Sequence, residues 1–226
     1  MSIIDDLKGK IIVSCQAMSG EPLYEENCML AMMSSVVNGG AAGLRVAGGR
    51  DVRNAKKYFN LPVIGLTKPE KLPENWREVV YITPTIKGVD DLIDAGADII
   101  AFDGTLRERK SGLNDYIIRI HSSGRLAMAD ISTLDEGVKC AGLGADIIST
   151  TLAGYTVESG EPSSEPDFEL LKNLVKNVAK PVILEGRIWN PEEVKKAFDI
   201  GAHCVVIGSA ITRPQLITKR FVEALK

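Results

Sequence analysis

Seven polar residues stand at the ends of short apolar runs that are spread along the chain. The runs are rich in Ile, Val, Leu and Ala, as buried strands are. The seven residues are Gln16, Arg45, Lys68, Asp103, Asp130, Thr151 and Glu185. One polar residue at a strand end is unremarkable, since strand ends often meet solvent. If all seven ends met at one edge, their charges would perturb one another's pKa values, as in an active site.

Lys68 and Glu185 are the candidate pair for proton transfer. Glu185 ends the run Pro181–Leu184, where an unpaired charge is costly, so the carboxylate needs a partner. Lys68 crowded by Arg45 would have a lowered pKa and could act as a base or as an amine nucleophile. The simpler alternative for Lys68 is a solvated lysine in a loop that contains prolines.

The elements that would position these residues form a repeated pattern of apolar strands and helical segments. Eight strands are predicted at residues 11–15, 43–47, 62–66, 98–103, 126–130, 146–151, 181–185 and 204–208. This pattern predicts an α/β fold, a closed (βα)₈ TIM barrel over residues 1–226 as one domain, because such barrels run from about 200 residues upward. The third and seventh strands would then lie opposite each other, with a small substrate between Lys68 and Glu185. The alternative is an open doubly wound sheet, but neither the Rossmann glycine motif nor the Walker loop is present.

A ninth apolar run, residues 79–83, has no place among eight strands. Pro69 and Pro73 precede it, and the chain between residues 66 and 79 is too short for a crossover helix. We therefore predict that residues 67–85 form an elaborated loop after the third strand. Residues 86–96 are then expected to form the helix of that unit.

Small residues after the seventh and eighth strands predict an anion site. Gly186 and Arg187 follow the seventh strand, and Gly208, Ser209 and Arg213 follow the eighth. In barrels of this kind the backbone N–H groups of these two loops bind phosphate. Each glycine alone could serve only a turn, but the two loops in this order indicate a phosphate cradle.

Composition favours a small-molecule partner. A net charge of −3 gives no bulk attraction to nucleic acid or to an anionic membrane, and no apolar stretch reaches the length of a membrane span. The first residues lack the apolar core of a signal peptide. The four cysteines are widely spaced, without a CxxC pair or histidines at ligand spacing, so we expect a cytoplasmic protein with neither metal nor cofactor. A homodimer is one possible assembly.

Other candidates for chemistry are weaker. His121 is expected near a helix end and His203 at the opposite face of the barrel, which argues against a Ser-His-Asp mechanism. Cys15 is better explained as a small buried hydrophobe than as a nucleophile. The acidic segment 158–167 is most simply a solvated loop, with a lid as the alternative.

Strings along nearly the whole chain resemble the bacterial N-acetylmannosamine-6-phosphate 2-epimerase family. They are IIVSCQA, GLRVAG, PVIGLTK, YITPT, DIIAFDGTLRER, MADIST, STTLAGYT, PVILEGRI and VVIGSAITRP. Lys110 departs from the proline that the family often has after RxR, and Trp189 from a smaller residue after EGRI. The resemblance implies a sialic-acid breakdown enzyme that interconverts N-acetylmannosamine 6-phosphate and N-acetylglucosamine 6-phosphate.

The resemblance also implies residue roles. Lys68 and Glu185 match the catalytic pair of the family, and Gln16, Arg45 and Asp130 match the residues that hold the sugar. Inversion at carbon 2 of an open-chain aldehyde needs a base and an acid but no redox cofactor. An aldolase with a Schiff base on Lys68 and a catalytically silent sugar-phosphate sensor remain alternatives.

Overall fold

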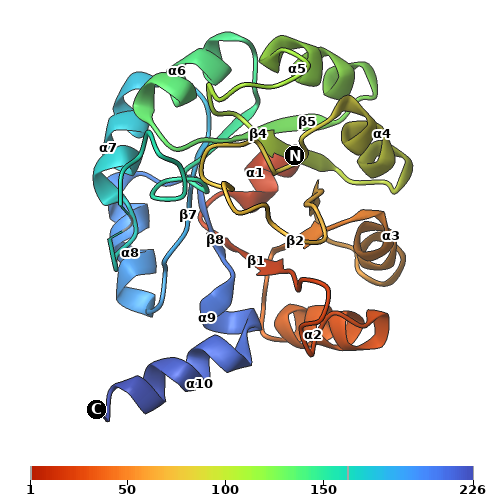
Figure 1. The fold of residues 1–226 in the computed structure, drawn as a ribbon, viewed down its shortest axis with the longest axis vertical. Coiled ribbons are helices and arrows are strands. Elements are labelled where there is room, and N and C mark those ends of the chain that lie inside the picture. Colours follow the sequence, from red (N-terminus) through yellow and green to blue (C-terminus); the bar gives the residue numbers. More distant parts are fainter. Residues whose placement is uncertain (1, 162, 226) are drawn as a thin grey trace.

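The computed structural model describes residues 2–161 and 163–225, and its eight parallel strands close into a barrel (Figure 1). Each strand pairs with the next in the chain, and the last pairs with the first. The strands are β1 (Ile11–Cys15), β2 (Gly43–Ala47), β3 (Val63–Leu66), β4 (Ile99–Asp103), β5 (Leu126–Asp130), β6 (Ile147–Ser149), β7 (Val182–Glu185) and β8 (Cys204–Ile207). The predicted (βα)₈ barrel is confirmed, and every strand falls within its expected range.

Most of the helices surround the barrel, whereas the first lies across one end of it and the last projects away from it (Figure 1). The helices are α1 (Ile3–Leu7), α2 (Glu26–Asn38), α3 (Gly49–Tyr58), α4 (Ile86–Asp94), α5 (Leu113–Ser122), α6 (Leu134–Gly142), α7 (Phe168–Asn177), α8 (Pro191–Ile200), α9 (Ser209–Thr212) and α10 (Pro214–Glu223). Within residues 2–161 and 163–225, none of the helices is long and apolar enough to cross a membrane.

Successive side chains on each strand point alternately to the two faces of the sheet. This alternation divides the core into two clusters and directs the site residues toward the barrel interior. The outer cluster fills the space between strands and helices, and a smaller cluster that includes Met128 and Ile183 fills the barrel. Because side chains two apart on a strand share a face, Asp130 points inward with Met128, and Glu185 points inward with Ile183.

The segment between β3 and α4 is a loop, as predicted. No strand is assigned in residues 67–85, all of which the structure describes. Thr85 caps α4 by accepting a hydrogen bond from the backbone N–H of Gly88 at 3.1 Å. The helix ends at Asp94, two residues before the expected end.

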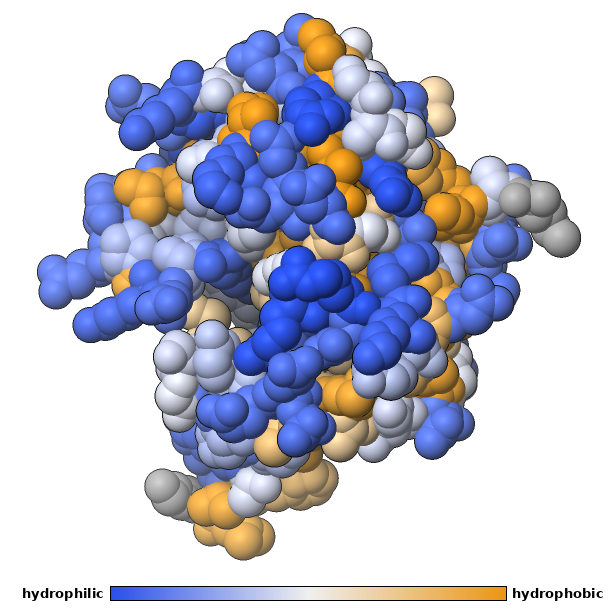
Figure 2. Space-filling model, turned by 90° about the vertical axis from the view of Figure 1, so that its right-hand side faces the viewer, coloured by the Kyte–Doolittle hydropathy of each residue, from blue (hydrophilic) through white to orange (hydrophobic). Residues whose placement is uncertain are grey.

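The C-terminal helix α10 projects from the barrel (Figure 1). None of its residues is buried, and Phe221 and Val222 are 73% and 52% exposed. Leu225, just beyond the helix, is 89% exposed. Figure 2 shows a mostly hydrophilic side of the molecule, with apolar side chains at the lower tip. The end of the chain therefore carries apolar surface that the barrel does not cover.

Candidate active site

A cavity of about 500 Å³ opens at the carboxyl ends of the strands. Its lining includes side chains or backbone from the ends of β1, β3, β6, β7 and β8. Among the predicted site residues it contains Gln16, Lys68, Thr151, Glu185, Gly186, Arg187, Gly208, Ser209 and Arg213. Such a volume suits a small ligand.

Glu185 is the last residue of β7, and its carboxylate reaches the cavity with 12% of the side chain exposed. Burial raises its pKa to about 7, although Arg45 opposes the shift, and the charge of Asp130 adds to it. Arg45 lies 3.0 Å from Glu185 Oε2, and Thr151 Oγ1 lies 3.1 Å from the same oxygen. Near neutrality Glu185 can therefore hold or release a proton.

Arg45 and Asp130 form a buried two-bond ion pair beneath the cavity. Their N···O distances are 2.6 and 3.1 Å, and their side chains are 1% and 0% exposed. Burial alone would lower the pKa of Arg45, but Asp130 and Glu185 hold it above its ordinary value. Arg45 was expected at a strand end; it lies in the middle of β2 instead, which explains its depth.

Lys68 follows β3 by two residues, lines the cavity and is half-buried. Burial and, to a smaller extent, the positive charge of Arg45 lower its pKa to about 8, against the opposing effect of Glu185. Within the described residues it makes no hydrogen bond or ion pair. Its amine is therefore available to a bound molecule.

Gln16 offers an acceptor to the same cavity. Its amide nitrogen donates to Ser14 Oγ at 2.7 Å, which fixes the orientation of the amide. Its Oε1 atom is buried and has no partner within the described residues. An unpaired buried acceptor is costly, so a ligand N–H or O–H would stabilise this site.

The two loops of the predicted cradle both line the cavity. Gly186 and Arg187 have positive φ values of 110° and 58°, which turn the chain sharply after β7. Arg187 donates to the carbonyls of Ala153 and Glu165 at 2.5 and 2.8 Å, while Arg213 donates to the carboxylate of Glu21. Both guanidinium groups are thus held in place at the cavity, which Gly208 and Ser209 also line.

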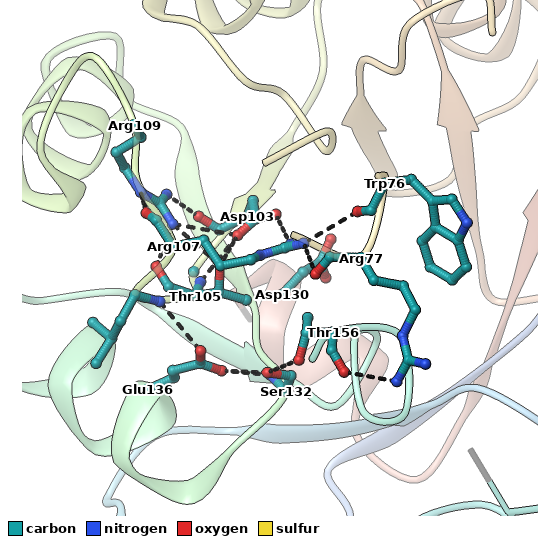
Figure 3. Close-up of polar contacts among 12 residues, drawn as sticks. Trp76, Arg77, Asp103, Thr105, Arg107, Arg109, Asp130, Ser132, Glu136 and Thr156 are labelled. Carbon is teal, nitrogen blue, oxygen red and sulfur yellow. Dashed lines mark hydrogen bonds and ion pairs between the residues drawn. The ribbon is translucent and has the colours of Figure 1, made fainter. Parts of the chain in front are cut away.

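Asp103 does not contribute to the cavity lining, contrary to expectation. Its carboxylate is 0% exposed and lies 2.6 Å from Arg107 Nη2, with Arg109 Nη2 at 3.3 Å (Figure 3). Thr105 donates to it from both its hydroxyl and its backbone N–H. With its oxygens used by these donors, Asp103 anchors the loop after β4.

Comparisons with known proteins identify the family. A family model described as "Putative N-acetylmannosamine-6-phosphate epimerase" matches residues 29–226. A Clostridium perfringens (strain 13) protein named "Putative N-acetylmannosamine-6-phosphate 2-epimerase" is 50% identical over 227 residues, 99% of this chain and 100% of the relative. A protein of the same name from Caldanaerobacter subterraneus is 47% identical, covering 100% of this chain and 95% of its own. The chain belongs to the N-acetylmannosamine-6-phosphate epimerase family.

Solved structures agree with this assignment. The structure of the N-acetylmannosamine-6-phosphate 2-epimerase from Clostridium perfringens matches with a TM-score of 0.93 at 48% identity, covering 99% of this chain and 96% of that one. The tryptophan synthase α-subunit of Pyrococcus furiosus matches with a TM-score of 0.66 at 15% identity, covering 96% and 93%. The second likeness shows the barrel fold alone.

The cavity of this epimerase-family chain has an aromatic wall that sequence reasoning missed. Trp76 lies 6.2 Å from Tyr81 and 6.3 Å from Tyr155, measured between ring centroids, and all three line the cavity. Two of them belong to loop 67–85, and aromatic residues in a long loop after a strand were the available signal. Trp189 also lines the cavity, with the Arg220 guanidinium 4.9 Å from its ring centroid.

The weaker candidates lie apart from the cavity of this epimerase-family member. His203 contacts the carbonyl of Ile4 at 2.8 Å at the opposite end of the barrel, and His121 contacts Asp146 at 2.8 Å. Cys15 is buried, which raises its thiol pKa to about 12. In the described part of the chain no cluster of three or more His, Cys, Asp or Glu is arranged to hold a metal ion.

The acidic segment 158–167 is mostly exposed, and its residue 162 lies outside the described residues. Arg77 of loop 67–85 contacts it, through Glu161 at 2.8 Å and the carbonyl of Gly160 at 2.5 Å. Arg77 also donates to the carbonyl of Thr156 at 3.0 Å. These contacts join the loops after β3 and β6 beside the aromatic wall.

Proposed function

We propose that this protein is an isomerase that interconverts N-acetylmannosamine 6-phosphate and N-acetylglucosamine 6-phosphate in sialic acid and amino sugar breakdown. One observation carries the proposal. Lys68 and Glu185, with pKa values of about 8 and 7, line the same cavity, so two groups that change protonation near neutral pH can reach one bound molecule. The identity of the substrate is inferred from the family to which the chain belongs.

The reaction inverts carbon 2, whose proton is acidic only when carbon 1 is an open-chain aldehyde. Lys68 and Glu185 act between them as base and acid, removing a proton and returning one to the opposite face of the carbon. The Lys68 ammonium, which lines the cavity, stabilises the enolate oxygen that forms. One proton leaves carbon 2 and one returns to it, with no change of oxidation state, so the reaction needs neither a redox cofactor nor a metal.

The remaining residues hold the substrate. We assign the phosphate to the loops after β7 and β8, with Gly186, Arg187, Gly208, Ser209 and Arg213 around it. Gln16 and Thr151 face the sugar. Arg45 and Asp130, which were expected to hold the sugar, are not among the cavity-lining residues; Arg45 instead fixes the Glu185 carboxylate from beneath, and Asp130 holds Arg45. The carboxylate of Asp103 is bound by Arg107 and Arg109 and takes no part in holding the substrate.

Proton NMR in deuterated water tests the proposal. N-Acetylmannosamine 6-phosphate incubated with the protein should give N-acetylglucosamine 6-phosphate, with deuterium at carbon 2 in the product. No epimer and no exchange would reject the proposal and favour a sensor. A sugar adduct on Lys68 after borohydride reduction would favour Schiff-base chemistry of the aldolase kind.

We also propose that the protein is cytoplasmic and forms a homodimer through α10. The exposed Phe221, Val222 and Leu225 make an apolar surface that a second copy of the chain would cover. Light scattering after gel filtration should give twice the chain mass, and Phe221→Asp should lower it toward one chain. A monomer in the unmodified protein would overturn the dimer without touching the proposed reaction.

A further inference from the structure

The unexplained apolar run 79–83 has a structural place between β3 and β4. These two strands pair at only two positions, Ile64 with Ile99 and Gly65 with Ile100. Beyond that point Ile82 accepts a hydrogen bond from the backbone N–H of Asp103 at 3.0 Å. The strands separate toward the mouth, and residues 82–83 occupy the space between them.

Thr83 joins the two separated strands. Its hydroxyl donates to the carbonyl of Ala101 in β4 at 2.6 Å and accepts from the backbone N–H of Thr67 at 3.1 Å. Its own backbone N–H donates to the carbonyl of Thr67 at 2.8 Å. Thr67, the residue directly before Lys68, therefore has both of its backbone groups bound by one residue.

The conformation of Thr83 is a costly one. It is 0% exposed and has a φ of 44°, in the left-handed region that disfavours a β-branched side chain. Glycine would adopt this conformation without that cost, but glycine has no hydroxyl to bridge Ala101 and Thr67. The strain is offset by the hydrogen bonds that only a hydroxyl residue makes there.

The side chain of Thr67 packs against α4, and the rest of the loop is anchored elsewhere. A Cβ atom at Gly88 in the first turn of α4 would lie 2.9 Å from Thr67 Oγ1, so Thr67 lies close against that helix. The middle of the loop is held independently, since Arg107 donates to the carbonyls of Trp76 and Arg77 at 3.3 and 3.1 Å (Figure 3). Loss of the Thr83 hydroxyl would thus release the backbone N–H of Thr67, beside Lys68, while the aromatic wall stays anchored.

We infer that Thr83 is a positioning residue for Lys68, aiming its amine into the cavity by fixing Thr67 between the separated ends of β3 and β4. The inference rests on the proposed role of Lys68. Thr83 contacts neither the phosphate loops nor Glu185, so its effect is on the placement of the amine and not on substrate affinity. A misplacement of a reacting group by about 1 Å can cost on the order of 100-fold in rate.

The experiment compares Thr83→Val, Thr83→Ser and Thr85→Val with the unmodified protein. We expect Thr83→Val to lower kcat by about tenfold or more with KM within about threefold, because the loss is one of orientation. We expect Thr83→Ser to keep most of kcat, because it retains the hydroxyl. Thr85→Val is the matched control: it removes a hydroxyl from the same loop, weakening the cap of α4 but no contact of Thr67, and should lower the melting temperature without lowering kcat.

The pH dependence of kcat/KM distinguishes a misplaced Lys68 amine from a general loss of structure. Burial and Arg45 keep the Lys68 pKa near 8, so an amine released toward solvent should titrate at higher pH. We expect the limb of the kcat/KM profile that belongs to Lys68 to shift upward in Thr83→Val and to stay in place in Thr85→Val. If Thr83→Val does not fold, Thr83→Gly relieves the strained φ and lacks the hydroxyl, and it should show the same loss and shift.

Two results would overturn the inference. One is a Thr83→Val or Thr83→Gly protein with unchanged kcat and pH profile; the other is a Thr83→Ser protein as impaired as Thr83→Val. Lys68→Ala in the same assay keeps the two proposals apart. Normal turnover in Lys68→Ala would remove Lys68 from the mechanism, whereas an inactive Lys68→Ala beside a normal Thr83→Val rejects only the positioning role.

Discussion

Lys68 and Glu185 owe their shifted pKa values to the same cause, burial, which acts in opposite directions on an amine and a carboxyl. We expect Lys68→Ala and Glu185→Gln each to lower kcat by about 100-fold or more, because each removes a proton-transfer group and no core packing. Steady-state kinetics measures the loss, and circular dichroism checks that the fold is retained. Near-normal kcat in either variant would show that the residue transfers no proton.

The same pair predicts a bell-shaped pH dependence of kcat/KM. One group must be protonated and the other deprotonated, so activity falls at pH values below the limb near 7 and above the limb near 8. This holds whichever of the two is the base, because both assignments require one proton on the pair. Initial rates across the pH range measure the profile. A profile that rises to a plateau, without a second limb, would contradict it.

At the scale of elements, the helices depend on close packing at particular glycines. A Cβ at Gly137 of α6 would lie 2.3 Å from Leu174 Cδ2 of α7, whereas a Cβ at Gly142 of the same helix meets nothing within 4 Å. Gly137→Ala should therefore lower the free energy of unfolding by about 1–3 kcal/mol, through overpacking. Gly142→Ala, the control, should change it by less than about 1 kcal/mol. Urea unfolding compares them, and equal values would show that Leu174 moves aside freely.

The phosphate loops give a second prediction at this scale. If they bind a dianion remote from carbon 2, Ser209→Asp should repel it and reduce kcat/KM for the phosphorylated sugar far more than for plain N-acetylmannosamine. The unmodified protein should prefer the phosphorylated sugar by several orders of magnitude, in kcat as well as in KM. The assay is kinetics on both sugars with both proteins. Equal efficiency on the two sugars would mean that these loops serve only as turns.

The sequence predicts the strands well, because each strand is an apolar run that ends at polar residues. Both signals lie within a few residues of the strand itself. The sequence also predicts the convergence of Lys68, Thr151 and Glu185 because barrel closure brings strand ends together. It cannot distinguish a carboxylate that reaches the cavity from one that is fully paired. Asp103 looks like Glu185 in sequence, and only the folded loop shows that Arg107 and Arg109 reach Asp103. The position of the Trp76 ring likewise depends on contacts within a loop, and a loop sequence has no periodic pattern from which such contacts could be predicted.

For the whole molecule, we expect exhaustive chelation followed by dialysis to leave kcat unchanged. The proposed reaction moves only protons, and Lys68 and Glu185 supply both acid and base, so no metal is needed to lower a pKa. The measurement is turnover before treatment, after treatment and after adding back divalent ions. Activity that is lost on chelation and returns only with a divalent ion would refute the expectation.

The closing seam of the barrel constrains the order of events during synthesis. Ile11 of β1 pairs with Val205 of β8, so the first strand of the barrel waits for synthesis of its last strand before its second edge is covered. Until then the growing chain exposes an unpaired strand edge that could pair with another chain. Contacts this distant in sequence fold slowly and leave time for aggregation. Aggregation should therefore be most frequent during synthesis, when many unfinished chains are present together. Slower translation, or a chaperone that covers the edge of β1, should raise the yield of folded protein.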